Sequence, residues 1–504
     1  MFRNARKSWN WSDGTGYQRT FDSFGRLTSY PLGNPSGTGI AAGLTRALAL
    51  DNAGRITGYI HTQAGVSQPG FDQVFTYDGL DRLVQDSMSG ATYAYNYDAT
   101  GNRTSWVVSG TTYANVVAPT SNRFSSVQSA GTGGGVVTNS YQFDAAGDVS
   151  NDGVTTYGFS ARGRMSSATI GANTVSYLYN GLDQRVAKTG STTLVPTGAA
   201  FYAYDESGQL LGEYDANLNP IYETVYVGVM PVSVLKQSGA ASSSTLQTAP
   251  YNVWTDQIDA PRVITRNTDE AIVWRWDAAE AFGMSTPNQN PSSIGAFVFN
   301  QRFPGQVFDQ ETGLDYNWHR DYNPALGRYV QSDPIGLQGG INTYGYVEGN
   351  PLRNFDFRGL TDLILEPVND PAYDVDQGYN NSNNYTVATH GYMDGATGKY
   401  DQTQVLGPNG QPMSIADLAN AILKGYKGSK PVQLNICGAG QGGKNSIAQN
   451  LANILASKLG SNVTVIAAPG YIQMAGYPTP PFGYSFVTAT PVTGGWQSFT
   501  GQKP

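Results

Sequence analysis

One short pattern recurs along the first half of the chain and restricts its possible folds more than any other feature. An aromatic residue is followed by Asp or Asn, two variable residues, Gly, and a polar residue that is often Arg. Clear copies begin at Phe21, Tyr97, Phe143 and Tyr204, looser copies at Leu50 and Phe159, and two copies with an early Gly and a late Asp at Tyr77 and Tyr179. The copies lie roughly 20 to 30 residues apart, with exceptions, which is typical of a repeat architecture.

The residue types of this pattern predict tight turns between strands. Asp or Asn caps a turn through its own side chain, and Gly adopts the positive φ that a hairpin needs. The stretches between the turns, such as residues 91–97, alternate in polarity as strands do. Because a single hairpin cannot bury its apolar face, stacked neighbours must complete each sheet. The sequence therefore predicts an all-β structure built from repeats.

Length and composition agree with this prediction. The 504 residues are too many for one core, so at least two cooperative units are expected. The 61 Gly and 32 Tyr residues suit short strands joined by turns, whereas disorder would require fewer aromatic residues and more charge. A net charge of −8 argues against nucleic acid as a general partner.

Several other classes are disfavoured by what the sequence contains. Its single cysteine excludes an internal disulfide framework and a Cys-rich metal site, and no cofactor or metal is expected. We predict no membrane span, because apolar runs of the necessary length are absent. The first residues do not resemble a signal peptide, so any export information is expected elsewhere.

Motifs between residues 299 and 360 narrow the prediction to a family. They are Phe303-Pro304-Gly305-Gln306, Glu311-Thr312-Gly313-Leu314, Tyr316-Asn317, Arg320-Asp321-Tyr322, Gly327-Arg328-Tyr329, Ser332-Asp333-Pro334-Ile335-Gly336-Leu337 and Asn342-Thr343-Tyr344-Gly345-Tyr346. With the repeats, they resemble the RHS family of YD-repeat polymorphic toxins over most of residues 1–360. The resemblance implies a repeat-built β shell over residues 1–298, a conserved core-associated region over 299–360, and a separate effector domain over 361–504. Single repeat residues are interpreted as scaffold, as are His61 and His319, which have no accompanying partner residues.

The end of the conserved region contains two candidate catalytic aspartates. By the resemblance, Asp333 and Asp356 match a self-cleaving aspartyl-protease arrangement that cuts the chain after Leu360, before Thr361, inside the shell. Paired carboxylates suit this chemistry, because one shared proton supplies both an acid and a base. The sequence departs from the family at Phe357, where Pro is usual. The alternative is that both aspartates only cap turns.

The composition and the pattern change after Leu360. The last arginine is Arg358, and Glu366 is the only later glutamate. Apolar spacing predicts strands over residues 385–389, 432–436 and 463–467 that alternate with helices over 414–423 and 446–459, with Ser414 as an N-cap. This β-α-β-α-β order predicts a small α/β domain with a mainly parallel sheet.

The only histidine and the only cysteine of this domain follow the first two predicted strands. His390 precedes Gly391, and Cys437 precedes Gly438. An imidazole that accepts the proton of a thiol gives the minimal set for covalent acyl transfer. The arrangement resembles the caspase-like cysteine peptidases, which implies that Cys437 is the nucleophile, His390 the general base, and the N–H of Gly391 an oxyanion donor.

Other chemistries fit less well. An HNH-type nuclease needs more than one histidine, a nucleic-acid enzyme normally uses arginine, an ADP-ribosyltransferase needs a Glu after its His, and a zinc protease needs a pair of ligands. The Gly-rich segment 438–444 is a poor phosphate loop, because no hydroxyl residue follows Lys444. A glycosidase that uses Asp370, Asp374, Asp376 or Asp394 stays open, as do structural roles for Cys437 and His390.

Three hypotheses for the effector therefore remain. It is a caspase-like cysteine peptidase that acts on target-cell proteins, a toxin of another hydrolase or transferase chemistry that does not use Cys437, or a non-enzymatic binding module on a surface-displayed protein. By the resemblance, the protein is secreted or delivered by a secretion system, and its partners are its own enclosed C-terminal domain, a protein substrate and an immunity protein.

Overall fold

The computed structural model describes residues 8–360 except 12, 24, 131–135, 239–246 and 337–340. Beyond residue 360 it describes residues 363–364, 385–388, 391–393, 400–406, 412–425, 431–435, 446–459, 462–467, 472–479, 483–491 and 497–501. The chain divides into two compact units. The first comprises Lys7–Pro334 and Tyr344–Leu360, and the second Met1–Arg6, Ile335–Thr343 and Thr361–Pro504.

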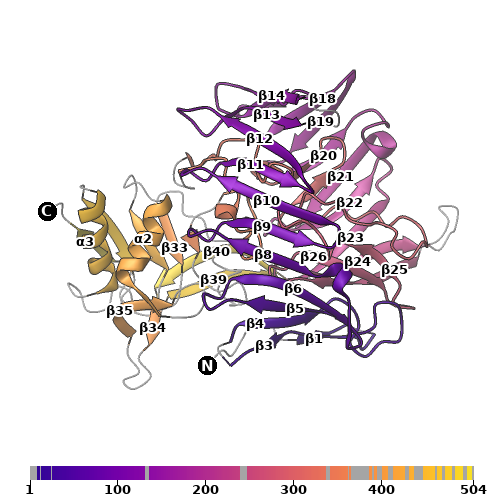
Figure 1. The fold of residues 1–504 in the computed structure, drawn as a ribbon, viewed down its shortest axis with the longest axis horizontal. Helices are drawn as coiled ribbons and strands as arrows, with labels where there is room; N and C mark the ends of the chain where they lie inside the picture. The colour runs from indigo at the N-terminus through magenta and orange to yellow at the C-terminus, as the bar shows by residue number, and fades with distance from the viewer. Residues whose placement is uncertain are drawn as a thin grey trace. The chain divides into compact units, whose positions relative to one another are not determined.

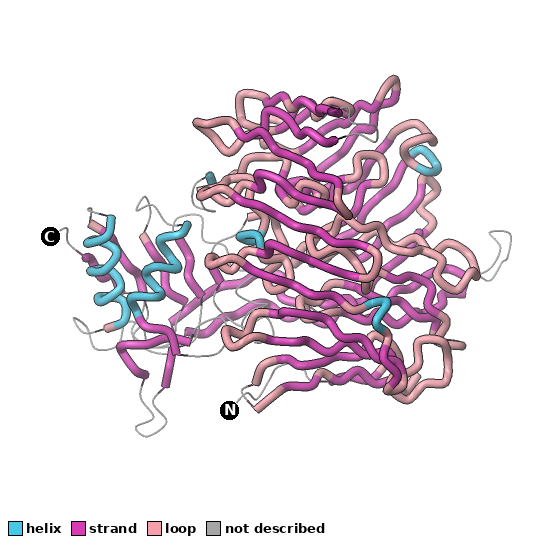
Figure 2. The backbone as a smooth tube through the Cα atoms, in the orientation of Figure 1, coloured by secondary structure: helices cyan, strands magenta, loops and turns pink. Residues whose placement is uncertain are grey.

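Two long antiparallel sheets make up most of the first unit, as Figure 1 and Figure 2 show. In the first sheet the strands follow one another nearly in chain order, and β7 pairs with β6 beside this path. Its strands are β3 (Thr20–Phe21), β4 (Leu27–Pro31), β5 (Leu44–Leu50), β6 (Ile56–Gln63), β7 (Val66–Ser67), β8 (Gln73–Tyr77), β9 (Leu83–Met88), β10 (Ala91–Tyr97), β11 (Arg103–Val108), β12 (Thr111–Val117), β13 (Phe124–Ala130) and β14 (Val136–Ser140).

The second sheet keeps strict chain order. Its strands are β15 (Gln142–Phe143), β16 (Val149–Asn151), β17 (Thr155–Phe159), β18 (Met165–Ile170), β19 (Asn173–Tyr179), β20 (Arg185–Thr189), β21 (Ala199–Tyr204), β22 (Leu210–Asp215), β23 (Pro220–Val227), β24 (Met230–Ser238), β25 (Gln247–Thr255), β26 (Pro261–Arg266) and β27 (Ile272–Arg275). The predicted all-β structure of consecutive hairpins is therefore present.

Shorter elements complete the first unit. The strands β1 (Ser8–Asn10) and β2 (Gly16–Gln18) form a hairpin, and a four-stranded antiparallel sheet contains β28 (Val307–Asp309), β29 (Leu314–Asn317), β30 (Arg320–Asn323) and β31 (Arg328–Tyr329). Three single 3-10 turns are η1 (Pro69–Phe71), η2 (Pro196–Gly198) and η4 (Val347–Gly349).

The repeat turns have the chemistry that the sequence predicts. The Asp51 carboxylate accepts two backbone N–H groups of its own turn at 2.9 Å and the Nε of Arg55 at 2.7 Å. Gly54 has a φ of 78°. In the two copies with an early Gly, Asp81 and Asp183 take the left-handed position instead, with φ of 62° and 61°. The turn needs one residue in this region, and Asp tolerates it better than most other residues do.

Where the aromatic residue of a repeat is a tyrosine, it ties its turn to the preceding repeat. The Tyr97 hydroxyl donates to the carbonyl of Leu83 at 2.9 Å, and Arg82, which pairs with Asp78 of its own turn, lies 4.7 Å from the centre of the Tyr97 ring. Equivalent hydrogen bonds join Tyr77 to Ile56, Tyr179 to Met165, Tyr204 to Arg185, and Tyr226 to Leu210. The abundance of tyrosine thus follows from a contact that every neighbouring pair of repeats can repeat.

Buried ion pairs hold the conserved region against the repeats. Arg185 of β20 pairs with Asp309 of β28, with one Nη atom 2.9 Å from Oδ1. Lys188 of the same strand lies 3.1 Å from Asp309 and 2.9 Å from Glu311. All four side chains are buried, so each charge needs its oppositely charged partner to offset the cost of leaving water. Residues 299–334 and 344–360 accordingly lie in the same compact unit as the repeats.

The second unit contains a parallel sheet with two helices. Its strands β32 (Leu363–Ile364), β33 (Tyr385–Ala388), β37 (Val432–Asn435) and β38 (Val463–Ala467) are parallel neighbours in that order, and β41 (Gln497–Gly501) adds an antiparallel edge. The helices are α2 (Ile415–Gly425) and α3 (Ile447–Leu459). Ser414 caps α2, since its Oγ accepts the N–H of Asp417 at 3.1 Å.

Two antiparallel groups in this unit were not expected from the sequence. One consists of β34 (Gly391–Met393), β35 (Tyr400–Leu406) and β36 (Pro412–Ser414), and the other of β39 (Ile472–Thr479) and β40 (Gly483–Pro491). The first group lies in the crossover between β33 and β37, where loops and a single helix were predicted. None of the helices among the described residues has the length and apolar character needed to cross a membrane.

The buried carboxyl group of Asp86, on β9, should make the stability of the first unit depend on pH. Its carboxylate accepts the N–H of Ala281 at 2.9 Å and the Gln73 amide at 3.1 Å. Burial, and then the neighbouring Glu280, raises the pKa of Asp86 to about 7, while Tyr95 and Arg103 also lie in this cluster. Because the folded pKa is raised, the contribution of Asp86 to stability falls as pH rises from about 4 to about 7.

We expect Asp86→Asn to gain stability relative to wild type across this range, by about 1.4 kcal/mol per pH unit. Urea unfolding of both proteins at several values between pH 5 and pH 8 measures the difference. A difference that stays constant with pH would show that Asp86 titrates normally.

Candidate functional site

One buried arginine holds both predicted catalytic aspartates. Arg320, the first residue of β30, places Nη1 3.0 Å from Oδ2 of Asp333 and Nη2 3.2 Å from Oδ2 of Asp356. Asp333 follows β31, Asp356 precedes Leu360, and all three side chains are almost inaccessible to solvent. The structure thus brings together two carboxylates that are separated in sequence.

A tyrosine completes the contacts of the Asp356 carboxylate on this side. The Tyr329 hydroxyl donates to Oδ2 of Asp356 at 2.8 Å, and the Arg320 guanidinium lies 3.7 Å from the centre of the Tyr329 ring. Burial, and then the charge of Asp356, raises the pKa of Tyr329 well above its usual value, so the phenol stays protonated and donates. Burial alone would lower the pKa of Arg320, but Asp333, Tyr329 and Asp356 raise it above its usual value. The guanidinium is therefore a fixed positive charge.

The other oxygen of Asp356 holds the end of the first unit. Oδ1 accepts the backbone N–H of Leu360 at 3.1 Å and that of Arg358 at 3.3 Å. Asp356 therefore caps the turn that leads to Leu360, as the structural alternative predicts, and at the same time shares a guanidinium with Asp333. One side chain has both roles.

Backbone carbonyls of this turn are fixed by the turn between β29 and β30. Arg320 Nε donates to the carbonyl of Gly359 at 2.6 Å, and Asn317 donates to that of Asp356 at 2.8 Å. Gly359 has a φ of 65°, and a Cβ there would lie 2.7 Å from the carbonyl oxygen of Asn317. Glycine is required at this position by both conformation and space.

His319 also holds this turn, and it does so as a neutral side chain. Its Nδ1 lies 2.9 Å from the carbonyl oxygen of Arg358, which can only accept, so Nδ1 carries the proton. Burial, and then Arg164, lowers the pKa of His319 to about 4. His61 also has a lowered pKa, of about 3, because of burial and then Arg46, whose Nε donates to its ring at 2.9 Å. Both histidines thus stay neutral at physiological pH.

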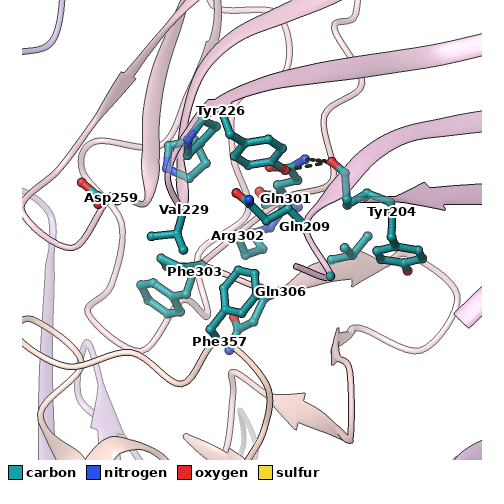
Figure 3. Close-up of a pocket in the computed structure, with 17 residues that line it drawn as sticks. Tyr204, Gln209, Tyr226, Val229, Asp259, Gln301, Arg302, Phe303, Gln306 and Phe357 are labelled. Carbon is teal, nitrogen blue, oxygen red and sulfur yellow. Dashed lines mark hydrogen bonds between the residues drawn. The ribbon is translucent and has the colours of Figure 1, made fainter. Parts of the chain in front are cut away.

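The opposite side of the turn faces a small pocket with a cavity volume of about 30 Å³. Phe357 lines it together with the conserved segment Phe303-Pro304-Gly305-Gln306 and tyrosines of the second sheet, as Figure 3 shows. Gln306 is buried, and neither polar atom of its amide has a hydrogen-bond partner among the described residues.

Sequence reasoning missed Arg320, Tyr329 and Asn317 as parts of this site. All three occur in motifs that carry the family resemblance, but nothing in the spacing shows that they converge on Asp356. A usable signal is the position of Arg320 in a short strand beside aromatic residues, because a buried guanidinium needs polar partners, among which carboxylates are the strongest.

The second predicted pair, His390 and Cys437, falls outside the described residues, as do Thr361 and the candidate glycosidase aspartates after it. His390 and Cys437 each come two residues after the end of a described strand. Those ends, Ala388 of β33 and Asn435 of β37, are register partners in adjacent parallel strands. Gly391 begins β34 and pairs with Val405. Groups of His, Cys, Asp and Glu that could hold a metal ion are not found in the part of the chain that the structure describes.

Comparison with known proteins assigns the first unit to a family. Residues 4–346 match the family model of the teneurin YD-shell, and residues 361–485 match a domain of unknown function (DUF8616). The chain therefore belongs to the teneurin YD-shell family. Named toxins among its relatives support the resemblance to the RHS/YD-repeat polymorphic toxins.

Individual relatives agree with this assignment. The chain is 36% identical over 184 residues to the putative uncharacterized protein YibJ of Escherichia coli (strain K12), which is 36% of this chain and 72% of YibJ. It is 30% identical over 233 residues to the double-stranded DNA deaminase toxin A of Burkholderia cenocepacia (strain H111), which is 45% of this chain and 14% of that toxin. The chain thus spans only a small part of the deaminase toxin.

A solved structure shows the same fold. A chain of the Photorhabdus luminescens Tc holotoxin pore superimposes with a TM-score of 0.55 and 18% sequence identity, over 70% of this chain and 18% of that chain. At this identity the likeness concerns the fold alone.

Removal of the Arg320 guanidinium, which Asp333 and Asp356 share, should greatly lower the stability of the fold. Arg320→Met leaves two buried carboxylates without their cation, which should lower the free energy of unfolding by about 3–5 kcal/mol. Arg26→Met, which removes a partly exposed partner of Asp22, is the matched control and should cost about 1 kcal/mol or less. Urea unfolding measures both changes.

Replacing both aspartates by Asn in the Arg320→Met background should restore part of the loss, because no unpaired charge is then buried. Equal costs for Arg320→Met and Arg26→Met would contradict the described geometry.

Proposed function

We propose that the first unit cuts its own chain between Leu360 and Thr361 and so frees the C-terminal domain as an effector. The observation that carries this proposal is the buried pair Asp333 and Asp356 on one guanidinium, with Asp356 bonded to the N–H of Leu360. That N–H lies one peptide unit before the proposed cut. The family resemblance supplies the reaction class.

The charges of the cluster suit an acid and a base. Arg320 contributes one positive charge, so a single proton on the carboxyl pair leaves the buried group neutral, and neutrality removes most of the cost of burial. In the proposed reaction the ionised carboxylate takes a proton from water, and the water oxygen attacks the carbonyl carbon of Leu360. The protonated carboxyl donates its proton to the departing nitrogen of Thr361. One water is consumed and one peptide bond is broken.

The match of a second family model from residue 361 onward supports this position of the cut. The first family model ends at residue 346 and the second begins at residue 361, so the Leu360–Thr361 bond lies at the start of the second match. A cut there separates the two without interrupting either.

The self-cleavage proposal predicts a fragment that begins at Thr361. Asp333→Asn and Asp356→Asn should each leave full-length chain, because one carboxyl cannot both donate and accept the proton. Intact mass measurement of the purified protein checks all three. Asp205→Asn, which changes a repeat-turn aspartate, is the control and should still be cut. A wild type that stays uncut, or is cut at another bond, would contradict the proposal.

For the effector we propose a caspase-like cysteine peptidase with Cys437 as nucleophile, His390 as general base and Gly391 as oxyanion donor. The parallel pairing of β33 with β37 supports it, because Ala388 lies opposite Asn435 and both candidate residues follow after two positions. Neighbouring strands lie about 4.8 Å apart, and reactive groups in such sheets gather beyond the carboxyl ends of the strands. The imidazole would take the thiol proton, the thiolate would attack a peptide carbonyl, and the imidazolium would protonate the leaving amine.

A second candidate is chemistry on DNA, favoured by the name of the deaminase toxin relative. Zinc deaminases bind their metal with one His and two Cys, or with three Cys. Residues 361–504 contain one His, one Cys and no Arg, so neither ligand set is available in this segment and the peptidase fits better. Deamination of double-stranded DNA by the purified protein would reverse this preference.

The remaining parts of the proposal rest on the family. The protein would be secreted or delivered by a secretion system, the effector would act on proteins inside a target cell, and an immunity protein would protect the producing cell. A non-enzymatic effector would be shown by binding to a target without any chemical change in it.

The peptidase proposal predicts that Cys437 and His390 are required for toxicity. Expression of the full chain in a bacterial cytoplasm should stop growth, and Cys437→Ala should abolish this effect because it removes the nucleophile. His390→Ala should nearly abolish it, and Cys437→Ser should fold but stay almost inactive, since a hydroxyl is much harder to deprotonate. Asn453→Ala, on the exposed face of α3, is the control and should stay toxic. Wild-type toxicity of Cys437→Ala at equal expression would exclude the cysteine peptidase.

A further inference from the structure

We propose that Phe357 is a positioning residue for the self-cleavage, an inference that rests on the function proposed above. Its ring holds the Asp356–Leu360 turn from the side opposite to the residues 317–320, which hydrogen-bond to the carbonyls of the turn. The turn is thereby fixed between two walls, and the carbonyl of Leu360 is kept in place near the carboxyl pair.

The first wall is polar and comes from residues 317–320. It contacts the turn through the backbone carbonyls of Asp356, Arg358 and Gly359, which accept from Asn317, His319 and Arg320. The Asp356 side chain adds bonds to two N–H groups within the turn. Phe357 takes part in none of these bonds, although it lies in the middle of the turn.

The second wall is the pocket that contains Phe303 and Gln306. Phe357 is 7% exposed and lines this pocket, and its side chain lies beside Gln306 and Phe303 at the end away from Tyr226, as Figure 3 shows. The contact extends to the backbone. A Cβ at Gly305, whose φ is 84°, would lie 2.1 Å from the carbonyl oxygen of Phe357. The Phe303–Gln306 turn therefore touches Phe357 so closely that only Gly fits between them.

The chemical consequence follows from distance. Leu360 is only three residues from Phe357, so loss of the buried ring from the pocket lining would let the Leu360 carbonyl move relative to Asp333 and Asp356. A displacement of about 1 Å can slow an oriented reaction by about a hundredfold. The carboxylates themselves would remain on Arg320.

The test is a pulse-chase measurement of self-cleavage of the full chain in a cell-free translation system. We expect Phe357→Ala to slow the appearance of the fragment that begins at Thr361 on the order of tenfold to a hundredfold. Phe357→Leu, which keeps an apolar side chain in the lining of the pocket, should stay within about threefold of wild type. Phe75→Ala is the matched control, because Phe75 on β8 is as well buried (2% exposed) but lies outside both walls.

The control separates positioning from stability. Phe75→Ala should lower the unfolding temperature of the chain and leave the rate of cleavage unchanged. Gly305→Ala gives a second variant with the ring intact, and its clash with the Phe357 carbonyl should also slow cleavage. Equal rates for wild type and Phe357→Ala, or equal slowing by Phe75→Ala, would overturn the positioning role while leaving self-cleavage in place. An uncut wild type would overturn both proposals.

Discussion

The carboxylate of each turn aspartate is the contact on which the repeat shell depends. It accepts backbone N–H groups of its own turn and, in many copies, an arginine four residues on, as Asp78 does with Arg82. That arginine lies against the tyrosine of the next repeat, and the tyrosine hydroxyl returns to a carbonyl of the repeat before it. One local turn thereby fixes both the bend within a hairpin and the spacing to its neighbour. The sheets can then continue over many strands although no single hairpin has a core of its own.

In the interior of the first unit, several buried charged side chains lie in pairs or small clusters of opposite charge. Asp309 pairs with Arg185 and Lys188, and Arg320 pairs with Asp333 and Asp356. The two clusters differ in their balance. Asp309 is joined by two cations, and Glu311 brings that group to neutrality, whereas the Arg320 cluster has one carboxylate more than it has cations. The Asp309 cluster is balanced in charge and joins the conserved region to the repeats, whereas the Arg320 cluster is the one for which self-cleavage is proposed.

Sequence reasoning succeeded where the determining interactions are local. Turn aspartates, left-handed glycines and the Ser414 cap depend on residues within four positions, so the turns and the bounds of α2 and α3 could be predicted closely. Asp333 and Asp356 were found by resemblance, but Arg320, which connects them, lies 36 residues from Asp356. The pocket that Phe357 lines brings together residues at longer separations still, among them Gly305 and Tyr226. Such convergence is set by the path of the whole chain, and one sequence does not show it.

The position of the proposed cut has a consequence for the stability of what remains. Every contact that holds the turn before the cut involves residues up to Leu360, from Asp356 on Arg320 to the carbonyls on residues 317–320. These contacts lie in the first unit, whereas Thr361 begins the main part of the second. A cut at that border therefore breaks one covalent bond and no described contact of the turn. The end at Leu360 would stay bound to Asp356 after such a cut, because none of the described contacts of the turn crosses the bond that breaks.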